Sequence, residues 1–385
     1  MFITILIFIA VLSVLVFVHE LGHFLTARFF GVKCEEFGMG LPPRAVGLQK
    51  KDGKWQAVWG NREIRPDEPM TYSLNWIPVG GFVKIKGENG EEAADTDSFG
   101  HKPIWQRNLI LAAGVTMNVF LTVILLTVAF AFGVPGSVDD LEGGQLIDQP
   151  KVQVVEVLDG SAAQTAGLRA GDVISAIDGQ AIDSSKTLQD LVAGKENQTV
   201  KILVKRGETD LEKSATITKV GDQVALGVGI VDLGTVRYPL HLAFWQALKT
   251  TWAWLVMIAL ALVGLIKQLF GGPSIGAEFA GPVGIAVMTG QAAQLGWTYV
   301  LQFAAMLSLN LAIINILPFP ALDGGRILFL TIGKLRGKMI DSKWENFSHN
   351  FGFILLMALI VFITYRDLLK YGAKILGVIG RSVGL

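Results

Sequence analysis

The chain has 385 residues, of which 51% are hydrophobic and only 17% carry a charge. Soluble domains carry a charge on about 25% of their residues, so this composition favours an integral membrane protein with a soluble part. The 33 basic and 33 acidic residues balance, which excludes nucleic-acid binding that relies on a net positive charge. The single cysteine, Cys34, excludes an internal disulfide and a cysteine-rich zinc site, and we expect it to act as a small hydrophobic residue.

Four apolar stretches are long enough to cross a bilayer, which takes about 20 residues. They cover residues 2–26, 108–133, 299–322 and 351–371. The stretch from Phe244 to Phe270 is ambiguous, because its cleanest apolar run, residues 250–266, lies at the lower limit for a span. Tryptophans crowd the start of this run, which suits either a short span or a helix that lies in the membrane interface.

The polar loop 28–107 contains the sequence NWIPVGGFVKIKGE, which starts at Asn75. After Gly80 and Gly81, the residues Phe82–Lys86 alternate between apolar and polar or small side chains, a pattern that predicts a β-strand. The apolar approach to this strand suits a hairpin that dips into the bilayer, which is tolerated only where protein covers its backbone. A purely structural hairpin is the alternative.

Residues 150–220 have the composition of a soluble domain with several strands and a short helix at SSKTLQDLVAG, which has a serine at its N-cap. The sequence SAAQTAGLRAGDVISAIDG (161–179), this helix and the later VKILVKRG together resemble a PDZ domain. Ala162 stands where that family usually has proline. The resemblance implies binding of an extended peptide end by strand addition; a plug or spacer without a ligand is the alternative.

The sequence HELGH places His19, Glu20 and His23 inside the first apolar stretch. On a helix the two histidines lie one turn apart on the same face, so both imidazoles can reach one metal ion. Glu20 lies beside them, where it can take a proton from a water activated by the metal. A charged side chain in the bilayer centre costs about 2.5–3.5 kcal/mol, which favours a metal site over two structural core histidines.

A catalytic zinc takes three protein ligands and water, and no third histidine follows in the extended HExxHxxGxxH spacing. The best candidate is Asp323 in the sequence NILPFPALDGGR, at the end of the third apolar stretch. Two prolines break the helix before it, and Gly324 and Gly325 allow a close backbone approach. The alternative role for Asp323 is to cap the helix that follows.

The HExxH sequence in the first apolar stretch and NILPFPALDGG in a later one together resemble the site-2 proteases, a family of intramembrane zinc metalloproteases. The sequences GFVKIKGE and GPVGIA extend the resemblance, which is greatest to the bacterial regulator-of-sigma-E protease group. Some of its members carry two PDZ domains, whereas this chain shows one. The resemblance implies Zn²⁺ bound by His19, His23 and Asp323, Glu20 as the general base, and Asn315 hydrogen-bonded near the substrate. It further implies substrate pairing along Gly81, Phe82, Val83 and Lys84.

The predicted fold is a polytopic α-helical membrane protein with about four transmembrane helices, a membrane-associated β-hairpin and an inserted, β-rich PDZ domain. Its predicted parts are residues 1–133 with the first two spans, the PDZ domain 150–220, an interfacial or re-entrant helical segment 240–298, and the last two spans in 299–385. The histidines and Asp323 each lie at the C-terminal end of a stretch. They can meet only if those two spans run in the same direction. The stretch 108–133 is then the single crossing between them, because a second crossing would reverse the later span. Residues 250–266 are therefore not expected to cross the membrane.

The loop 324–350 is rich in lysine and arginine, which places it in the cytoplasm and the PDZ domain outside. The resemblance implies a protein of the bacterial inner membrane, and this orientation places its metal site near the cytoplasmic side.

The predicted function is that of an intramembrane zinc endopeptidase, which hydrolyses peptide bonds within or near transmembrane segments of membrane proteins. The predicted substrates are single-pass membrane proteins. The resemblance implies an anti-sigma factor or remnant signal peptides as substrates. One alternative is a non-catalytic PDZ scaffold with a structural zinc. The other is a metal transporter, which needs further polar residues along the spans.

Overall fold

The structure, a computed structural model, describes residues 2–383 except for 63, 66–67, 89–93, 139–140, 208, 221–222, 270, 272–279 and 339. The chain divides into two compact units, which are described separately below. The first unit combines Met1–Leu126 with Ala247–Leu385, and the second is Thr127–Gln246. The second unit is therefore an insertion into the first.

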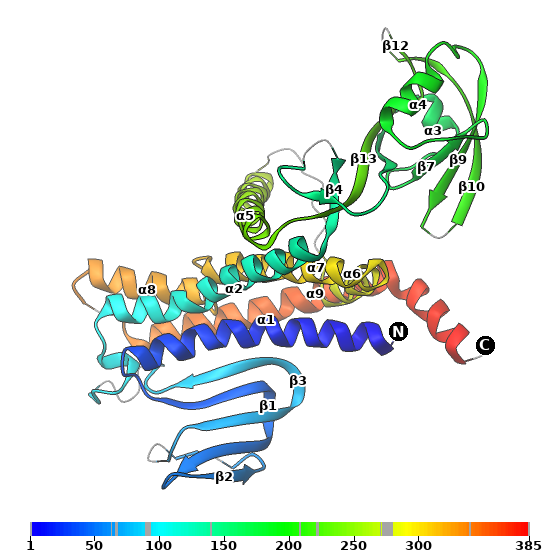
Figure 1. Ribbon diagram of the computed structural model, residues 1–385. Helices are drawn as coiled ribbons and strands as arrows, with labels where there is room; N and C mark the ends of the chain where they lie inside the picture. The colour runs from blue at the N-terminus through cyan, green and yellow to red at the C-terminus, as the bar shows by residue number, and fades with distance from the viewer. Residues whose placement is uncertain are drawn as a thin grey trace. The chain divides into compact units, whose positions relative to one another are not determined.

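Helices dominate the first unit, because an apolar chain in lipid must satisfy its backbone groups internally. They are α1 (Phe2–Phe29), α2 (Ile104–Phe132), α5 (Leu240–Leu269), α6 (Pro282–Leu295), α7 (Trp297–Ile316), α8 (Asp323–Leu335) and α9 (Ser342–Val383), with a short 3₁₀ turn, η1 (Phe99–His101), before α2. The helices α2 and α5 continue into the second unit. In Figure 1, α1 and α7 run in the same direction, whereas α2 and α9 run in the opposite one.

Within the described residues, five helices are long and apolar enough to cross a membrane, one more than the four stretches that the sequence singles out. The additional one is α5, a continuous helix of 30 residues. It extends the clean apolar run 250–266 at both ends, so its length suits a span as well as an interfacial helix. The interfacial placement stays a prediction, and residues 272–279 of the predicted segment lie outside the described residues.

A β-sheet packs against α1 in the first unit (Figure 1). It consists of β1 (Cys34–Lys51), β2 (Lys54–Trp59) and β3 (Thr71–Ile85). The strands β1 and β3 both fold back on themselves, so that Phe37 pairs with Tyr72 on one side and Val83 on the other. The resulting order is 54–59, 46–51, 71–75, 36–39 and 81–85. Residues 81–85, which include most of the strand predicted from sequence, form an edge of this sheet.

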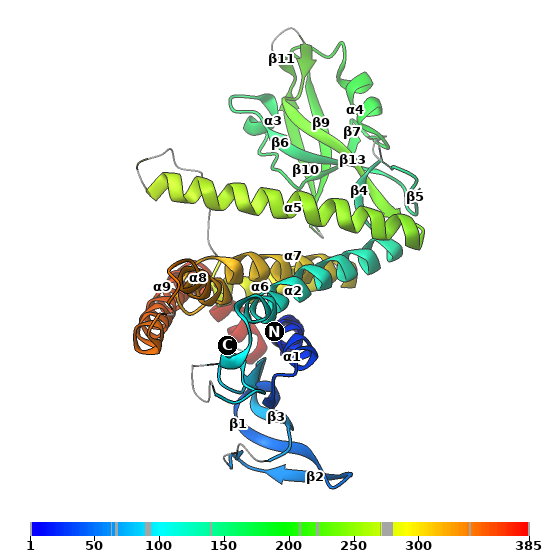
Figure 2. The same cartoon turned by 90° about the vertical axis from the view of Figure 1, so that its left-hand side faces the viewer.

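The second unit is a β-rich domain with short helices. Its elements are β4 (Val134–Ser137), β5 (Gln145–Leu146), β6 (Lys151–Val157), α3 (Ala162–Thr165), β7 (Val173–Ile177), β8 (Gln180–Ala181), α4 (Ser185–Val192), β9 (Thr199–Arg206), β10 (Thr209–Thr216), β11 (Thr218–Val220), β12 (Gln223–Ala225) and β13 (Val228–Arg237). The main sheet has the order β10-β9-β7-β6-β13-β4, with α4 packed beside β13 (Figure 2). The strand β13, an interior strand between β6 and β4, lies beyond the predicted range 150–220.

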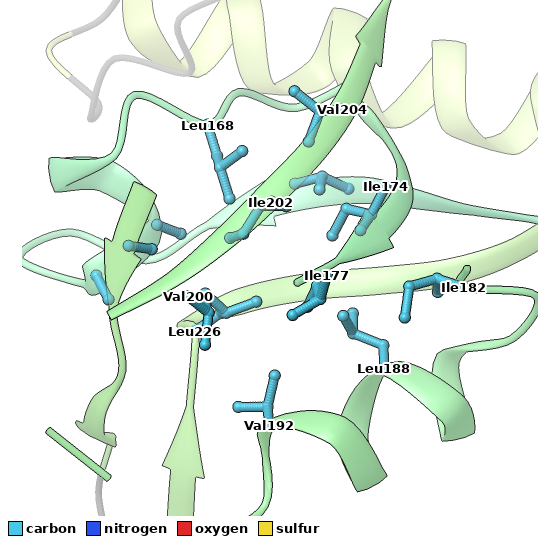
Figure 3. Close-up of a cluster of buried hydrophobic side chains, with 14 of the residues drawn as sticks. Leu168, Ile174, Ile177, Ile182, Leu188, Val192, Val200, Ile202, Val204 and Leu226 are labelled. Carbon is cyan, nitrogen blue, oxygen red and sulfur yellow. The ribbon is translucent and has the colours of Figure 1, made fainter. Parts of the chain in front are cut away.

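Local sequence explains the elements that were expected here. Ser184 caps α4, and its side chain accepts a hydrogen bond from the backbone N–H of Thr187, as the sequence predicted. Alternating residues of β9 point into one core, so that Val200, Ile202 and Val204 are fully buried (Figure 3). This period of two is the pattern of a strand with one face on the core.

Two neighbouring residues of β9 test this packing. Ile202 is 0% exposed and Leu203 is 40% exposed. We expect Ile202→Ala to lower the free energy of unfolding of the inserted domain by about 2–5 kcal/mol, because it leaves a cavity. The control, Leu203→Ala, should cost about 1 kcal/mol or less. Urea-dependent proteolysis of the full chain in detergent measures both, and equal midpoints for the two variants would contradict the assignment of the core face.

Candidate metal centre

Three polar side chains converge inside the first unit. His19 and His23 lie on α1, and Asp323 is the first residue of α8. The Oδ2 atom of Asp323 lies 3.0 Å from Nε2 of His19 and 3.4 Å from Nε2 of His23, and the two Nε2 atoms are 3.2 Å apart. Ligands at about 2.0–2.1 Å from a tetrahedral zinc lie about 3.3 Å from one another. The three atoms are therefore spaced as ligands of a single ion.

The partners of the two imidazoles fix which nitrogen faces the centre of this group. Nδ1 of His23 lies 2.9 Å from the carbonyl oxygen of Ile110. Because a carbonyl only accepts, Nδ1 carries the proton and Nε2 presents a lone pair. This arrangement, in which the second nitrogen donates to a backbone oxygen, is typical of histidines that bind a metal.

Asn118 on α2 gives His19 the same orientation. Its side-chain amide lies 3.2 Å from Nδ1 of His19, and its Oδ1 atom is buried without a hydrogen-bond partner among the described residues. Turning the amide so that Oδ1 faces His19 satisfies that oxygen and places the proton on Nδ1. Both Nε2 lone pairs then face each other and the Asp323 carboxylate, a donor set that a divalent cation neutralises. The residues present fit zinc.

Two glycines bring α1 and α2 close enough for this geometry. A Cβ atom on Gly22 would lie 2.4 Å from the carbonyl oxygen of Ala113. A Cβ atom on Gly114 would lie 2.4 Å from Nε2 of His23 and 2.8 Å from Cε1 of His19. The helix α2 therefore forms a wall of the site at Gly114. Neither Gly114 nor Asn118 was predicted from the sequence to belong to the site. The pattern that could have indicated them is a glycine and a polar residue one turn apart in an otherwise apolar helix.

Glu20 connects the site to the sheet. Its Oε2 atom accepts a hydrogen bond from the backbone N–H of Val83, at 3.1 Å. A Cβ atom on Gly81 would come within 4.0 Å of Cγ of Glu20 and within 2.9 Å of the carbonyl oxygen of Gly38, so a side chain at this position would crowd the approach of the strand. The edge of β3 thus lies directly beside the carboxylate predicted to be the general base.

The other predicted site residues lie at different distances from this centre. The Nδ2 atom of Asn315, at the end of α7, is 3.4 Å from Nε2 of His19. The side chain of Phe82 packs over Gly38, and Lys84 forms an ion pair with Glu35 at 2.7 Å. The side chains of Phe82 and Lys84 therefore pack on the sheet, and the contact of this strand with Glu20 is made by the backbone N–H of Val83.

Comparison with known proteins shows the family of the chain. The model of peptidase family M50 matches residues 7–59 and 63–359. The chain belongs to peptidase family M50. This M50 peptidase is 30% identical to the regulator of sigma-W protease RasP of Bacillus subtilis, over 95% of this chain and 98% of that protein. It is 32% identical to a protein of Clostridium perfringens named as a zinc metalloprotease, over 93% of this chain and 96% of that protein.

The predicted resemblance to the site-2 proteases is confirmed, and the chain is a zinc metalloprotease of that type. Among solved structures, the PDZ domain of an SdrC-like protein from Listeria monocytogenes is 29% identical to this M50 peptidase. The match covers 22% of this chain and 92% of the solved PDZ domain, with a TM-score of 0.21.

Gly114 offers a test of the metal centre. We expect Gly114→Ala to abolish zinc binding, because its methyl group would occupy the space between the two imidazoles. The matched control is Gly372→Ala on α9, where an added Cβ meets nothing within 4 Å. Zinc content of the purified proteins, measured by atomic absorption, should fall to background only in the first variant. Full zinc content in Gly114→Ala would contradict the site.

Proposed function

We propose that this M50 peptidase cuts a membrane-embedded segment of another membrane protein, with His19, His23 and Asp323 as the zinc ligands and Glu20 as the general base. The observation that carries the proposal is the spacing of 3.0–3.4 Å among the three ligand atoms, with both imidazoles turned to present Nε2. A zinc ion bound there supplies Lewis acidity, which polarises the substrate carbonyl and lowers the pKa of water at the site.

The chain's own residues supply the proton transfers. Glu20 is the glutamate of the HExxH sequence. Its carboxylate takes the proton of the attacking water and returns it to the leaving nitrogen. The N–H of Val83, 3.1 Å from Oε2 of Glu20, orients this carboxylate. The side-chain amide of Asn315, whose Nδ2 atom lies 3.4 Å from Nε2 of His19, can donate a hydrogen bond to the substrate carbonyl.

A transmembrane helix hides its carbonyl groups in hydrogen bonds, so a substrate must be unwound before it is cut. The segment Gly81–Ile85 forms an edge of the sheet beside Glu20, and an edge strand offers unpaired backbone groups to an extended peptide. We infer that the unwound substrate adds to this edge. Backbone pairing is tolerant of sequence, which predicts broad specificity.

The direction of the helices supports the proposed topology. The helices α1 and α7 run in the same direction, and α2 runs in the opposite one (Figure 1). If α5 crossed the membrane, a further crossing would be required before α7, and the 14 residues of α6 span only about 21 Å of a hydrocarbon core of about 30 Å. We therefore propose that α5 lies in the interface of a bacterial plasma membrane. The inserted domain then lies outside and the metal centre near the cytoplasm.

The proposed substrates are single-pass membrane proteins. A relative is named for regulation of sigma-W, which supports a membrane-anchored anti-sigma factor as one class of substrate; remnant signal peptides are the second. The inserted domain is proposed to bind a peptide end of the substrate by strand addition.

Glu20→Gln separates this function from a scaffold with a structural zinc and from a transporter. We expect the variant to retain zinc and to cleave a single-pass substrate at least about 100-fold more slowly, because the general base is lost. The control is Glu212→Gln, at an exposed residue of β10, which should cleave normally. Cleavage is measured with purified enzyme and substrate in detergent. Unchanged cleavage by Glu20→Gln would exclude the proposed mechanism.

The edge strand is tested at Val83. The N–H of Val83 points to Glu20 rather than into the sheet, and proline is tolerated at such positions of edge strands. We expect Val83→Pro to keep its zinc but to lose about tenfold or more in kcat/KM, because it cannot orient Glu20. Val83→Ala keeps the N–H and should stay within about twofold. Equal kcat/KM for the two variants would show that this N–H has no role.

A further inference from the structure

The turn that precedes Asp323 has an uncommon backbone. The carbonyl oxygen of Phe319 accepts a hydrogen bond from the N–H of Leu322 at 3.2 Å, with Pro320 and Ala321 between them. Ala321 has a φ of 77°. Proline at the second position and a positive φ at the third are the features of a type II turn, in which the third residue is normally glycine or asparagine. Alanine is strained in this conformation because of its Cβ atom.

The helix α9 holds the central peptide group of this turn at both ends. Nδ1 of His349 accepts a hydrogen bond from the N–H of Ala321 at 2.9 Å. Three residues later, a Cβ atom on Gly352 would lie 2.4 Å from the carbonyl oxygen of Pro320, so only glycine fits beneath that oxygen. The ring of His349 packs against Phe329 of α8, with the centroids 5.5 Å apart. The imidazole is therefore fixed in place and used as an acceptor.

The hydrogen bond to His349 selects the strained form of the turn. Type I and type II turns differ by a flip of the central peptide. A flip to type I would return Ala321 to a negative φ and relieve its strain, but it would turn the N–H of Ala321 away from His349. The acceptor on α9 thus stabilises the orientation that the alanine disfavours.

This orientation matters because α8 begins directly after the turn. Asp323 is the first residue of α8, and its Oδ2 atom must lie within 3.4 Å of both imidazoles. The flip itself would leave the path of the chain nearly unchanged, but it would aim the carbonyl oxygen of Pro320 at the ring of residue 349, where the smaller N–H now lies. The crowding would push the turn, and with it the start of α8, away from α9. The position of the carboxylate therefore depends on the form of the turn.

We propose that His349 is a positioning residue for the metal ligand Asp323, which acts through the backbone of Ala321 without touching metal or substrate. This inference rests on the proposed metal centre. It assigns a role to a histidine outside the HExxH sequence and explains why a positive φ persists at an alanine two residues from the ligand.

The test is a double-mutant cycle between His349 and Ala321, with zinc affinity as the readout. His349→Phe keeps a ring beside Phe329 but offers no acceptor. We expect it to raise the zinc dissociation constant of the full chain about tenfold, as for other residues that orient metal ligands, and to reduce cleavage at limiting zinc more than at saturating zinc. Competition with a chromogenic chelator in detergent measures the affinity.

Glycine at position 321 should reverse this effect. Because glycine adopts a positive φ without strain, we expect Ala321→Gly to recover most of the lost affinity in the His349→Phe background and to change it little in the native chain. Asn118→Ala is the control background. It weakens the site through His19, so Ala321→Gly should give it no recovery. A gain that is equal in both backgrounds would show a general effect and overturn the proposal.

Two further outcomes are decisive. Zinc affinity within twofold of the native value in His349→Phe would overturn the inference and leave the metal centre intact. A native chain that binds no zinc would contradict the metal centre and the inference together. If His349→Phe does not fold, His349→Gln replaces it. We expect His349→Gln to have a zinc affinity between those of the native chain and Asn118→Ala, and we expect Ala321→Gly to restore it. The absence of any recovery would overturn the proposal.

Discussion

The structure is organised around three polar atoms that approach one another within an apolar bundle. Two imidazole nitrogens and a carboxylate oxygen lie within 3.4 Å of one another, on segments that are 300 residues apart in the chain. A divalent cation held by these atoms would accept their lone pairs and offset the cost of burying the carboxylate charge. The packing of α1, α2, α7 and α8 is what brings them together, and it therefore requires α1 and α7 to run in the same direction.

Glycine is used where this convergence requires a close approach. Gly22 lets α1 approach the backbone of α2 at Ala113, and Gly114 lets α2 approach the two imidazoles on α1. On the other side, a Cβ atom on Gly324 would lie 2.2 Å from the carbonyl oxygen of Ile316 at the end of α7, and one on Gly325 would lie 2.3 Å from that of Phe319 in the turn. The two glycines after Asp323 thus allow α8 to start against the end of α7, and the strained turn at Ala321 completes the change of direction.

The sheet of the first unit joins the proposed substrate-binding edge to the proposed general base. Its edge segment, residues 81–85, contacts α1 through the hydrogen bond from Val83 to Glu20. The same strand leads to Glu88, which pairs with Arg326 of α8. The proposed substrate-binding edge, the proposed general base and the helix of the third ligand are thus linked by direct contacts, so that a peptide added to this edge would lie next to the reacting groups.

The sequence by itself determined the class of protein and predicted which residues form the metal centre. Long apolar stretches, the one-turn spacing of His19 and His23, and the broken helix before Asp323 are local patterns, and each follows from the geometry of a single segment. The segment VKILVKRG, which forms part of the predicted resemblance to a PDZ domain, likewise lies largely in a strand of the inserted domain.

What depends on contacts between distant segments could not be obtained in this way. The fold-back of β1 and β3, the place of β13 between β6 and β4, the wall at Gly114, the hydrogen bond between His19 and Asn118, and the acceptor at His349 all join residues that are far apart in the chain. The sequence also left α5 ambiguous, because a helix of that length and composition suits two placements. Periodicity reports only which side of a segment is apolar, whereas the tertiary structure decides which other segment that side meets.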